Sequence, residues 1–339
     1  MNRILMGICL STLLSACEVG IVTPTPNPAD HDDAWLDPIE EDTAQAMNDT
    51  ARDTAFEDTE SELEDTGEDL KPLTDFLQVG PYSVSAESRT ASVTNCSNMS
   101  YSIYSPDGTT NPPTVILGHG FARGADVMNG WANHLSSWGV EVLLPTLCHY
   151  NVFAGVDHEM NGQNMKELVD LHGATNAVYA GHSAGGLAAI IAASQDSSAA
   201  GVVGLDTTDT EDVPGVEDYI GLSYAPSVNC PAYALIGEPS TCNSNNNGLG
   251  LFRMMSDYSV IKINSADHCD FENPTDFVCE LSCENSTAIF EDSEISEAII
   301  TLGTAAIISL AGISEDGERV WSEEGLENWI ASGLISELE

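Results

Sequence analysis

The chain has 339 residues, of which 54 are acidic and nine are Lys or Arg, so its formal net charge at pH 7 is −45. Such an excess of negative charge repels phosphate backbones and anionic lipid headgroups, because binding to either depends on clustered Lys and Arg. The composition therefore excludes a nucleic-acid-binding protein. The length suits one large domain or two small ones.

The first 17 residues have the layout of a bacterial export signal. A short start that contains one Arg precedes an apolar run, residues 4–14, which is too short to span a bilayer. The run leads into the sequence LSAC, which resembles a lipobox, and Cys17 would then become the lipidated first residue of the mature protein. The residue after Cys17 is Glu, not the Asp that favours retention in the inner membrane, so we expect an anchor in the outer membrane or at the cell surface. An ordinary signal peptide with an incidental Cys is the alternative.

The segment that follows, residues 18–70, is acidic. It holds 18 acidic residues and a single base, Arg52, with few large apolar residues. Such a segment cannot bury enough apolar surface to offset the entropy lost on ordering, so we expect a disordered, extended linker. Calcium binding by its Asp-Thr pairs is the weaker alternative, because the EF-hand spacing is missing. The folded domain is expected to span residues 71–339.

Cysteine usage agrees with export. Seven cysteines remain outside the export signal: Cys96, Cys148, Cys230, Cys242, Cys269, Cys279 and Cys283. In an oxidising compartment they allow up to three disulfides with one thiol left over. The local candidates are Cys230 with Cys242, and a pair drawn from Cys269, Cys279 and Cys283. A zinc site at Cys279 and Cys283 is the alternative, but it lacks a second paired Cys or His element. We expect no metal and no organic cofactor.

From residue 72 onward, short apolar strands alternate with helical patterns. The expected strands are 113–117, 140–144, 177–180, 201–205, 232–236 and 258–263. The expected helices are 127–135, 160–171 and 186–193. This alternation predicts parallel βαβ units, and therefore an α/β domain with a mostly parallel, twisted sheet covered by helices on both faces. Residues 82–104 look like antiparallel strands that lead into the sheet. The apolar stretch 298–313 is short and interrupted by polar residues and Gly, so we expect a buried helix.

The chemistry concentrates in the sequence GHSAG at residues 181–185. An apolar strand precedes this motif and a helix follows it, which is the context that a nucleophile elbow requires. Small neighbours allow Ser183 to occupy a tight turn with its hydroxyl exposed above the sheet. The alternative is a Gly-rich turn without catalysis.

A serine nucleophile needs a base, and the base needs a carboxylate that fixes its tautomer. In nucleophile-elbow enzymes the chain order is Ser, acid, His. His268 is the only His after residue 182 and follows the last expected strand, so it is the expected base. The acid is expected at Asp206, which ends the strand 201–205. Glu238 after the next strand is the second candidate, and Asp209, expected in a solvated loop, is the third.

The oxyanion of an acyl-transfer intermediate needs preorganised donors. We expect one from the N–H of Ala184, directly after the nucleophile. The N–H of Phe121, in the loop after the strand 113–117, is the expected second donor. Histidines before Ser183 are expected in loops or at the surface, although His119 is placed near the site.

Taken together, these motifs resemble one enzyme family. They are Gly118-His119-Gly120-Phe121, Trp131, residues 181–186, Gly204-Leu205-Asp206 and Asp267-His268-Cys269-Asp270. They are similar to those of α/β-hydrolases of the chlorophyllase and dienelactone-hydrolase-like group, which is related to bacterial cutinase-like polyester hydrolases. The resemblance covers about residues 78–312 and supports the roles of Asp206 and His268. It implies the α/β-hydrolase fold and a serine hydrolase that cleaves small or polymeric carboxylic esters through an acyl-enzyme. A non-catalytic binding or adhesion lipoprotein on a hydrolase scaffold is the alternative.

The lipobox hypothesis predicts the outcome of one substitution. Cys17→Ser should abolish incorporation of labelled fatty acid and either release the protein or strand its precursor, because acyl chains on Cys17 are the only strong membrane affinity expected in the mature chain. Deletion of residues 22–68, by contrast, should leave the hydrolysis rate and the melting temperature nearly unchanged. Continued partition of the Cys17→Ser protein into washed membranes would contradict the hypothesis.

Overall fold

The computed structural model describes residues 73–151, 155–209, 219–283 and 288–338. Residues Gly67–Glu339 group into one compact unit. The expected export signal with Cys17 and most of the acidic segment 18–70 precede this unit, and both lie outside the described residues.

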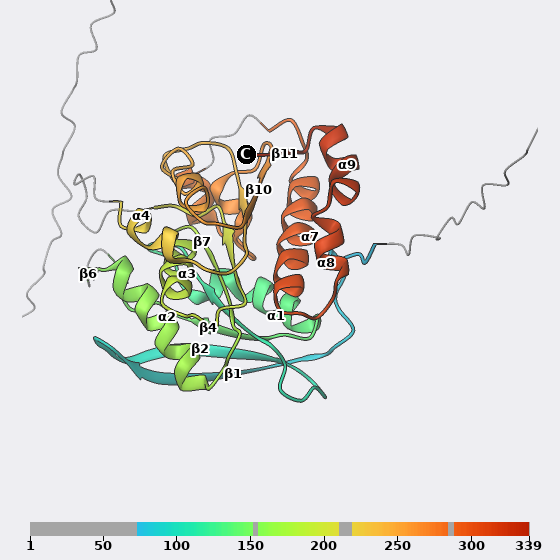
Figure 1. The fold of residues 1–339 in the computed structure, drawn as a ribbon. Coiled ribbons are helices and arrows are strands. Elements are labelled where there is room, and N and C mark those ends of the chain that lie inside the picture. Colours follow the sequence, from blue (N-terminus) through green and yellow to red (C-terminus); the bar gives the residue numbers. More distant parts are fainter. Residues whose placement is uncertain (1–72, 152–154, 210–218, 284–287, 339) are drawn as a thin grey trace, which may run out of the picture. The chain divides into compact units, whose positions relative to one another are not determined.

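The described residues form a sheet of nine strands in the order β1-β2-β4-β3-β7-β8-β9-β10-β11 (Figure 1). The strands are β1 (Val84–Val93), β2 (Cys96–Pro106), β3 (Thr114–Gly118), β4 (Glu141–Pro145), β7 (Val178–His182), β8 (Gly201–Leu205), β9 (Ala232–Ile236), β10 (Tyr258–Ile263) and β11 (Ile335–Glu337). Neighbouring strands from β4 to β10 pair in parallel. The hairpin of β1 and β2, and the strand β11 at the other edge, pair antiparallel. The expected mostly parallel α/β sheet is therefore confirmed.

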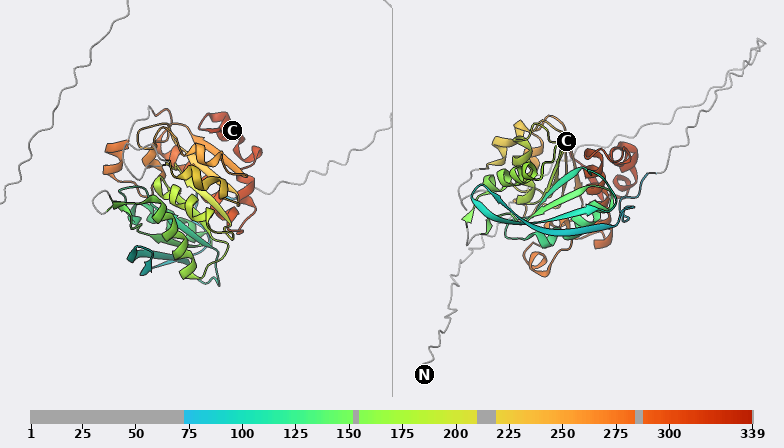
Figure 2. Two further views of the ribbon diagram at one scale, coloured as in Figure 1. Left: turned by 60° about the vertical axis from the view of Figure 1, so that its left-hand side comes forward. Right: turned by 90° about the horizontal axis from the view of Figure 1, so that it is seen from below.

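Helices cover both faces of this sheet (Figures 1 and 2). On one face lie α1 (Asn129–Ser137), α7 (Asp292–Leu310), α8 (Asp316–Val320) and α9 (Glu323–Ser332). On the other lie α2 (His158–His172), α3 (Ala184–Ser194), α4 (Gly221–Tyr224) and α5 (Leu249–Phe252). The remaining elements are α6 (Phe277–Cys283), the 3₁₀ helices η1 (Ala125–Met128), η2 (Ala225–Ser227) and η3 (His268–Phe271), and the small ribbon of β5 (Tyr150–Asn151) and β6 (Gly155–Val156).

The core has two halves, one on each side of the sheet. Successive side chains of a strand point to opposite faces. In β3, Val115 and Leu117 enter the half beneath α1 and α7, whereas Ile116 enters the half beneath α2 and α3. A strand buried on both faces needs apolar residues at every position, which explains why these strands read as continuous apolar runs.

Helix α7 is long and apolar enough to cross a membrane by length and composition alone. In the structure it packs against the sheet, and 56% of its most apolar window is buried inside the protein. Side chains such as Ile299, Leu302 and Ile307 belong to the core half that also contains Trp131. The expectation of a buried core helix is therefore confirmed.

Helix α3 approaches the centre of the sheet so closely that backbone touches backbone. A Cβ on Gly185 would lie 2.4 Å from the carbonyl carbon of Gly118, and one on Gly181 would lie 2.3 Å from that of Gly185. Glycines on both elements therefore set the distance between α3 and strands β3 and β7. This contact fixes the first turn of the helix directly behind the ends of those strands.

Three disulfides form among the expected seven cysteines: Cys96–Cys148, Cys242–Cys283 and Cys269–Cys279. Cys230 is left with a free, buried thiol. The expected pair among Cys269, Cys279 and Cys283 is confirmed as Cys269–Cys279. The expected pairing of Cys230 with Cys242 is wrong, because Cys242 bonds Cys283, and the five-residue strand β9 separates Cys230 from Cys242. Such a strand rises about 16 Å, far beyond the Cα separation that a disulfide allows.

The close packing of α3 generates a stability prediction. Gly185→Ala should lower the free energy of unfolding by about 3 kcal/mol or more, because the added methyl group meets backbone atoms that have no room to move. Gly250→Ala is the matched control, since a Cβ at that helical position meets nothing within 4 Å. The control should be neutral or stabilise by up to about 1 kcal/mol in urea titrations. Equal effects of the two changes would contradict the packing argument.

Candidate active site

Ser183 sits in a sharp turn between the end of β7 and the start of α3. Its backbone has φ 56° and ψ −125°, a conformation that residues other than glycine rarely adopt. The turn is held because the Ser183 N–H donates to the carbonyl of Leu205 at 3.0 Å and the Ser183 carbonyl accepts from Gly186 at 3.0 Å. The strain is therefore balanced by hydrogen bonds and by the glycine packing of α3, and it places the Oγ at the carboxyl edge of the sheet.

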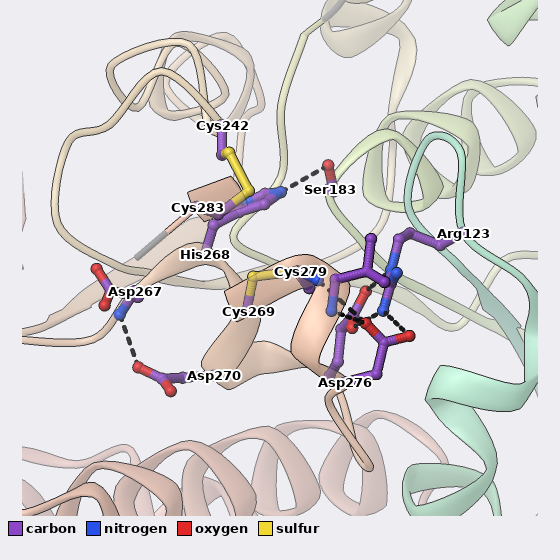
Figure 3. Close-up of a disulfide and its surroundings, with 12 residues drawn as sticks. Arg123, Ser183, Cys242, Asp267, His268, Cys269, Asp270, Asp276, Cys279 and Cys283 are labelled. Atoms are coloured by element: carbon purple, nitrogen blue, oxygen red, sulfur yellow. Dashed lines mark hydrogen bonds and ion pairs between the residues drawn. A yellow bond between two sulfur atoms is a disulfide. The ribbon is translucent and has the colours of Figure 1, made fainter. Parts of the chain in front are cut away.

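His268 reaches this serine from the 3₁₀ helix η3, which follows β10. Its Nε2 lies 3.0 Å from Ser183 Oγ (Figure 3). Its Nδ1 lies 2.5 Å from Asp206 Oδ2 and donates to that carboxylate. Because the ring proton sits on Nδ1, Nε2 keeps a free lone pair, and this lone pair accepts from the Ser183 hydroxyl. The structure thus brings together all three residues of the expected triad.

Asp206 directly follows β8, and its φ of 44° turns the chain away from the sheet. The two carboxylate oxygens are occupied by donors: Oδ1 accepts from the Gly237 N–H at 2.9 Å, and Oδ2 accepts from the Asn243 side chain at 3.1 Å as well as from His268. The Asn243 amide is fully buried and also donates to the carbonyl of Glu238. Asn243 was not among the expected site residues, because nothing in the sequence distinguishes it from the other Asn residues of the same loop.

The other two candidate acids lie away from His268. Glu238 accepts from the Ser265 N–H at 3.0 Å and pairs with Lys262 at 2.7 Å. Asp209 is buried, not solvated as expected, and accepts from the Gly221 N–H at 3.0 Å. Burial raises the pKa of Asp209 to about 6. Both carboxylates thus have structural partners of their own.

The expected oxyanion donors lie on either side of the serine. Ala184 is the first residue of α3, so its N–H has no acceptor within the helix. Phe121 lies in the turn after β3, and the next residue, Ala122, donates its N–H to the carbonyl of Tyr150 at 3.0 Å. A Cβ on Gly120 would lie 3.3 Å from Ser183 Cβ, so the loop passes directly beside Ser183.

His119 supports the loop after β3 that carries Gly120 and Phe121, which is called the oxyanion loop below after its expected role. His119 itself lies in this loop and near the site, as expected, but it is completely buried and not at the surface. Its Nε2 accepts from the Leu147 N–H at 2.9 Å, and its Nδ1 donates to the carbonyl of Gly120 at 2.8 Å. Burial lowers the pKa of His119 to about 4, so the ring is neutral at pH 7 and ties the loop to the segment after β4.

His182 is also buried and lies against the imidazole of His268. Its ring centroid is 4.6 Å from that of His268, and its Nε2 donates to the His268 carbonyl at 2.9 Å. Burial holds the pKa of His182 well below its usual value. A neutral ring here braces His268 without placing a second positive charge beside it.

An ion pair joins the oxyanion loop to the segment that carries His268. Arg123 binds both carboxylate oxygens of Glu272 at 2.7 Å, and it also contacts Asp276 at 3.0 Å (Figure 3). The Glu272 side chain is completely buried, and burial raises its pKa. Bidentate Arg-carboxylate pairs fix orientation as well as distance. Residues 123 and 272 are 149 positions apart, so no local pattern in the sequence indicates this pair.

These elements surround a cavity of about 230 Å³ above the serine. Ser183 and His268 contribute to its wall together with the apolar groups of Phe121, Val278 and the half-cystines at 242, 279 and 283. Of its charged wall groups, Arg123 and Glu272 neutralise each other. The cavity can therefore hold an uncharged group next to the hydroxyl.

A metal site among the cysteines was the alternative to disulfides. The Sγ atoms of Cys269, Cys279 and Cys283 lie within 4.8 Å of one another, close enough to share an ion. Each of them, however, is bonded to another sulfur, and metal binding needs free thiolates. The oxidised site therefore has no cysteine ligands to offer.

Comparison with known proteins adds no family assignment. The sequence matches no protein-family model, and no curated protein matches it.

The buried His119 generates a prediction about pH. In the unfolded chain the imidazole binds a proton near pH 6.5, but in the folded protein only near pH 4. Between these values acid favours the unfolded state, so stability falls as the pH drops from 7 to 4.5. His119→Gln removes this dependence. We expect the wild type to lose about 2 kcal/mol more than the variant over that range in urea titrations. An identical loss in both proteins would show that folding does not change the pKa of His119.

Proposed function

We propose that this protein is a serine hydrolase of the α/β-hydrolase fold that cleaves carboxylic esters through an acyl-enzyme. The observation that carries the proposal is the continuous chain from Ser183 Oγ through His268 to Asp206, with the serine on a strained turn between strand and helix. The chain order Ser, Asp, His and the position after a central parallel strand also agree with the nucleophile elbow of these enzymes.

In the first half of the reaction, Ser183 Oγ attacks the ester carbonyl carbon while His268 Nε2 takes the hydroxyl proton. The carbonyl π electrons move to the oxygen, which accepts from the N–H groups of Ala184 and Phe121. Asp206 stabilises the imidazolium through its hydrogen bond to Nδ1. The tetrahedral intermediate then collapses, the bond to the alkoxy oxygen breaks, and His268 returns the proton to the leaving alcohol.

In the second half, water attacks the acyl carbon of the ester on Ser183. His268 Nε2 takes one proton from the water, and the oxyanion occupies the same two N–H donors. Collapse of this intermediate releases the carboxylic acid and returns the proton to Ser183 Oγ. The residues described supply every proton transfer, so the proposed reaction needs water and no further co-reactant.

Three disulfides suit an extracytoplasmic compartment, because disulfides persist in oxidising surroundings. We place the enzyme outside the cytoplasm, held on the outer membrane or cell surface by acyl chains on Cys17. The acidic linker would then separate the enzyme from the lipid. Such a tether gives the domain access to small esters or to polymeric ones outside the cell.

A fluorophosphonate probe tests the nucleophile. It should label the native protein but not Ser183→Ala, and Ser183→Ala should lower the turnover of p-nitrophenyl butyrate by about 10⁴-fold or more, because the triad acts as a unit. A variant that keeps a tenth of the activity would contradict the mechanism. Absence of labelling and turnover in the native protein would instead favour a binding protein on this scaffold.

A matched pair of substitutions tests the acid at pH 8. Asp206→Asn should lose at least about a hundredfold in kcat, because the imidazole loses the partner that fixes its tautomer and stabilises its cation. Glu238→Gln should lose less than about tenfold, since Glu238 contacts Lys262 and the backbone of Ser265 but not His268. Thermal melts serve as the folding control, and the reverse ranking would move the acid to Glu238.

A further inference from the structure

Helix α6 exposes its large apolar side chains to solvent. Phe277 is 72% exposed, Val278 64% and Leu281 73%, and these three residues are called the α6 face below. The buried side of the helix carries Cys279 and Cys283 instead. This arrangement inverts the usual one, in which a surface helix buries its apolar stripe. An exposed apolar cluster of this kind indicates a contact surface.

Cross-links, not burial, hold this helix. A helix of seven residues is not stable alone, and α6 buries few apolar side chains of its own. Cys279 is bonded to Cys269, next to the catalytic base, and Cys283 is bonded to Cys242, next to the Asn243 that binds Asp206 (Figure 3).

The start of the helix is attached as well. Asp276 accepts from the N–H groups of Val278 and Cys279 at 3.0 Å each and contacts Arg123 of the oxyanion loop at 3.0 Å. These attachments of α6 therefore go to segments that carry parts of the proposed catalytic machinery. A group that binds the α6 face is held in a fixed position relative to Ser183.

The α6 face is continuous with the active-site cavity. Val278 belongs to both, and Cys279 and Cys283 line the cavity that also contains Ser183. Phe121, 37% exposed, extends the same apolar rim from the oxyanion loop. At about 230 Å³ the cavity is smaller than the roughly 300–1,000 Å³ typical of ligand sites. A long substrate therefore has to extend over the rim.

We propose that the α6 face binds the apolar chain of an ester substrate where that chain extends beyond the cavity. The occupant is apolar, because the three side chains of the α6 face carry no charge or hydrogen-bonding group. An anion is disfavoured as well, since Arg123 is already matched by Glu272 and Asp276 and the exposed Glu280 on the helix repels negative charge. The proposal rests on the proposed esterase function, which it deepens by assigning preference for long apolar chains to α6.

The test compares two substrates, p-nitrophenyl butyrate and p-nitrophenyl dodecanoate. In the double variant Phe277→Ser, Leu281→Ser, the ratio of kcat/KM for dodecanoate over butyrate should fall at least tenfold. Phe277→Leu, which keeps an apolar side chain, should retain most of the wild-type ratio. Leu171→Ser is the matched control, since Leu171 is 63% exposed near the end of α2 that leads into β7, opposite the edge with Ser183. The control should leave the ratio unchanged, and thermal melts verify folding.

The possible results separate the two proposals. If the wild type hydrolyses neither ester, the esterase function fails. If it hydrolyses both and the double variant keeps the wild-type ratio, the role of the α6 face is wrong while the function stands. The other possible occupant of the α6 face is a second copy of this chain, and analytical ultracentrifugation tests for it. A wild-type dimer that becomes monomeric in the double variant would show that the α6 face is a contact between two copies, and this result would also overturn the proposal.

Discussion

The position of His268 above Ser183 depends on cross-links to the segment that carries it. Residues 264–283 contain only the short helices η3 and α6, so little secondary structure of their own holds them against the sheet. The buried Arg123–Glu272 ion pair ties this segment to the oxyanion loop, and the indole N–H of Trp131 donates to the Phe271 carbonyl at 2.9 Å. His268, the loop after β3 and helix α1 are therefore oriented as one unit, and rigid support of this kind is what the proposed catalysis needs.

The sequence predicts the parallel strands better than the edge strand β11, which was not predicted. Strands β8 and β9 begin and end where their apolar runs do, because a strand buried on both faces needs an apolar residue at every position. Strand β10 also has the expected bounds, although it carries Ser259 and Lys262. The short helices α4, α5 and α6 were not predicted. None spans two helical turns, so periodicity has too few positions to show itself. In α6 the hydrophobic pattern also indicates the wrong buried face, since its large apolar residues face solvent and Cys279 and Cys283 take the buried positions.

Some residues of the candidate site could likewise be predicted from the sequence, and others could not. Ser183 and His268 follow from a motif and from chain order, which depend on short stretches of sequence. Chain order alone allows both Asp206 and Glu238 as the acid. The structure brings Asp206 to His268 because the chain turns at φ 44° directly after β8, while Glu238 turns to Lys262 on the neighbouring strand. Partners such as Asn243 and Glu272 come from loops distant in sequence, and only the tertiary fold brings them together.

Among the described residues Cys230 alone has a free thiol, and this makes it a natural probe of local unfolding. Cys230 is buried beside the start of β9, and burial raises its pKa to about 11, so at pH 7 roughly one molecule in ten thousand carries the reactive thiolate there. The other cysteines of the described domain are already oxidised. Within the described domain, alkylating reagents therefore reach a free thiol only when this half of the core opens. The rate of alkylation reports the opening equilibrium of that half, without any engineered label.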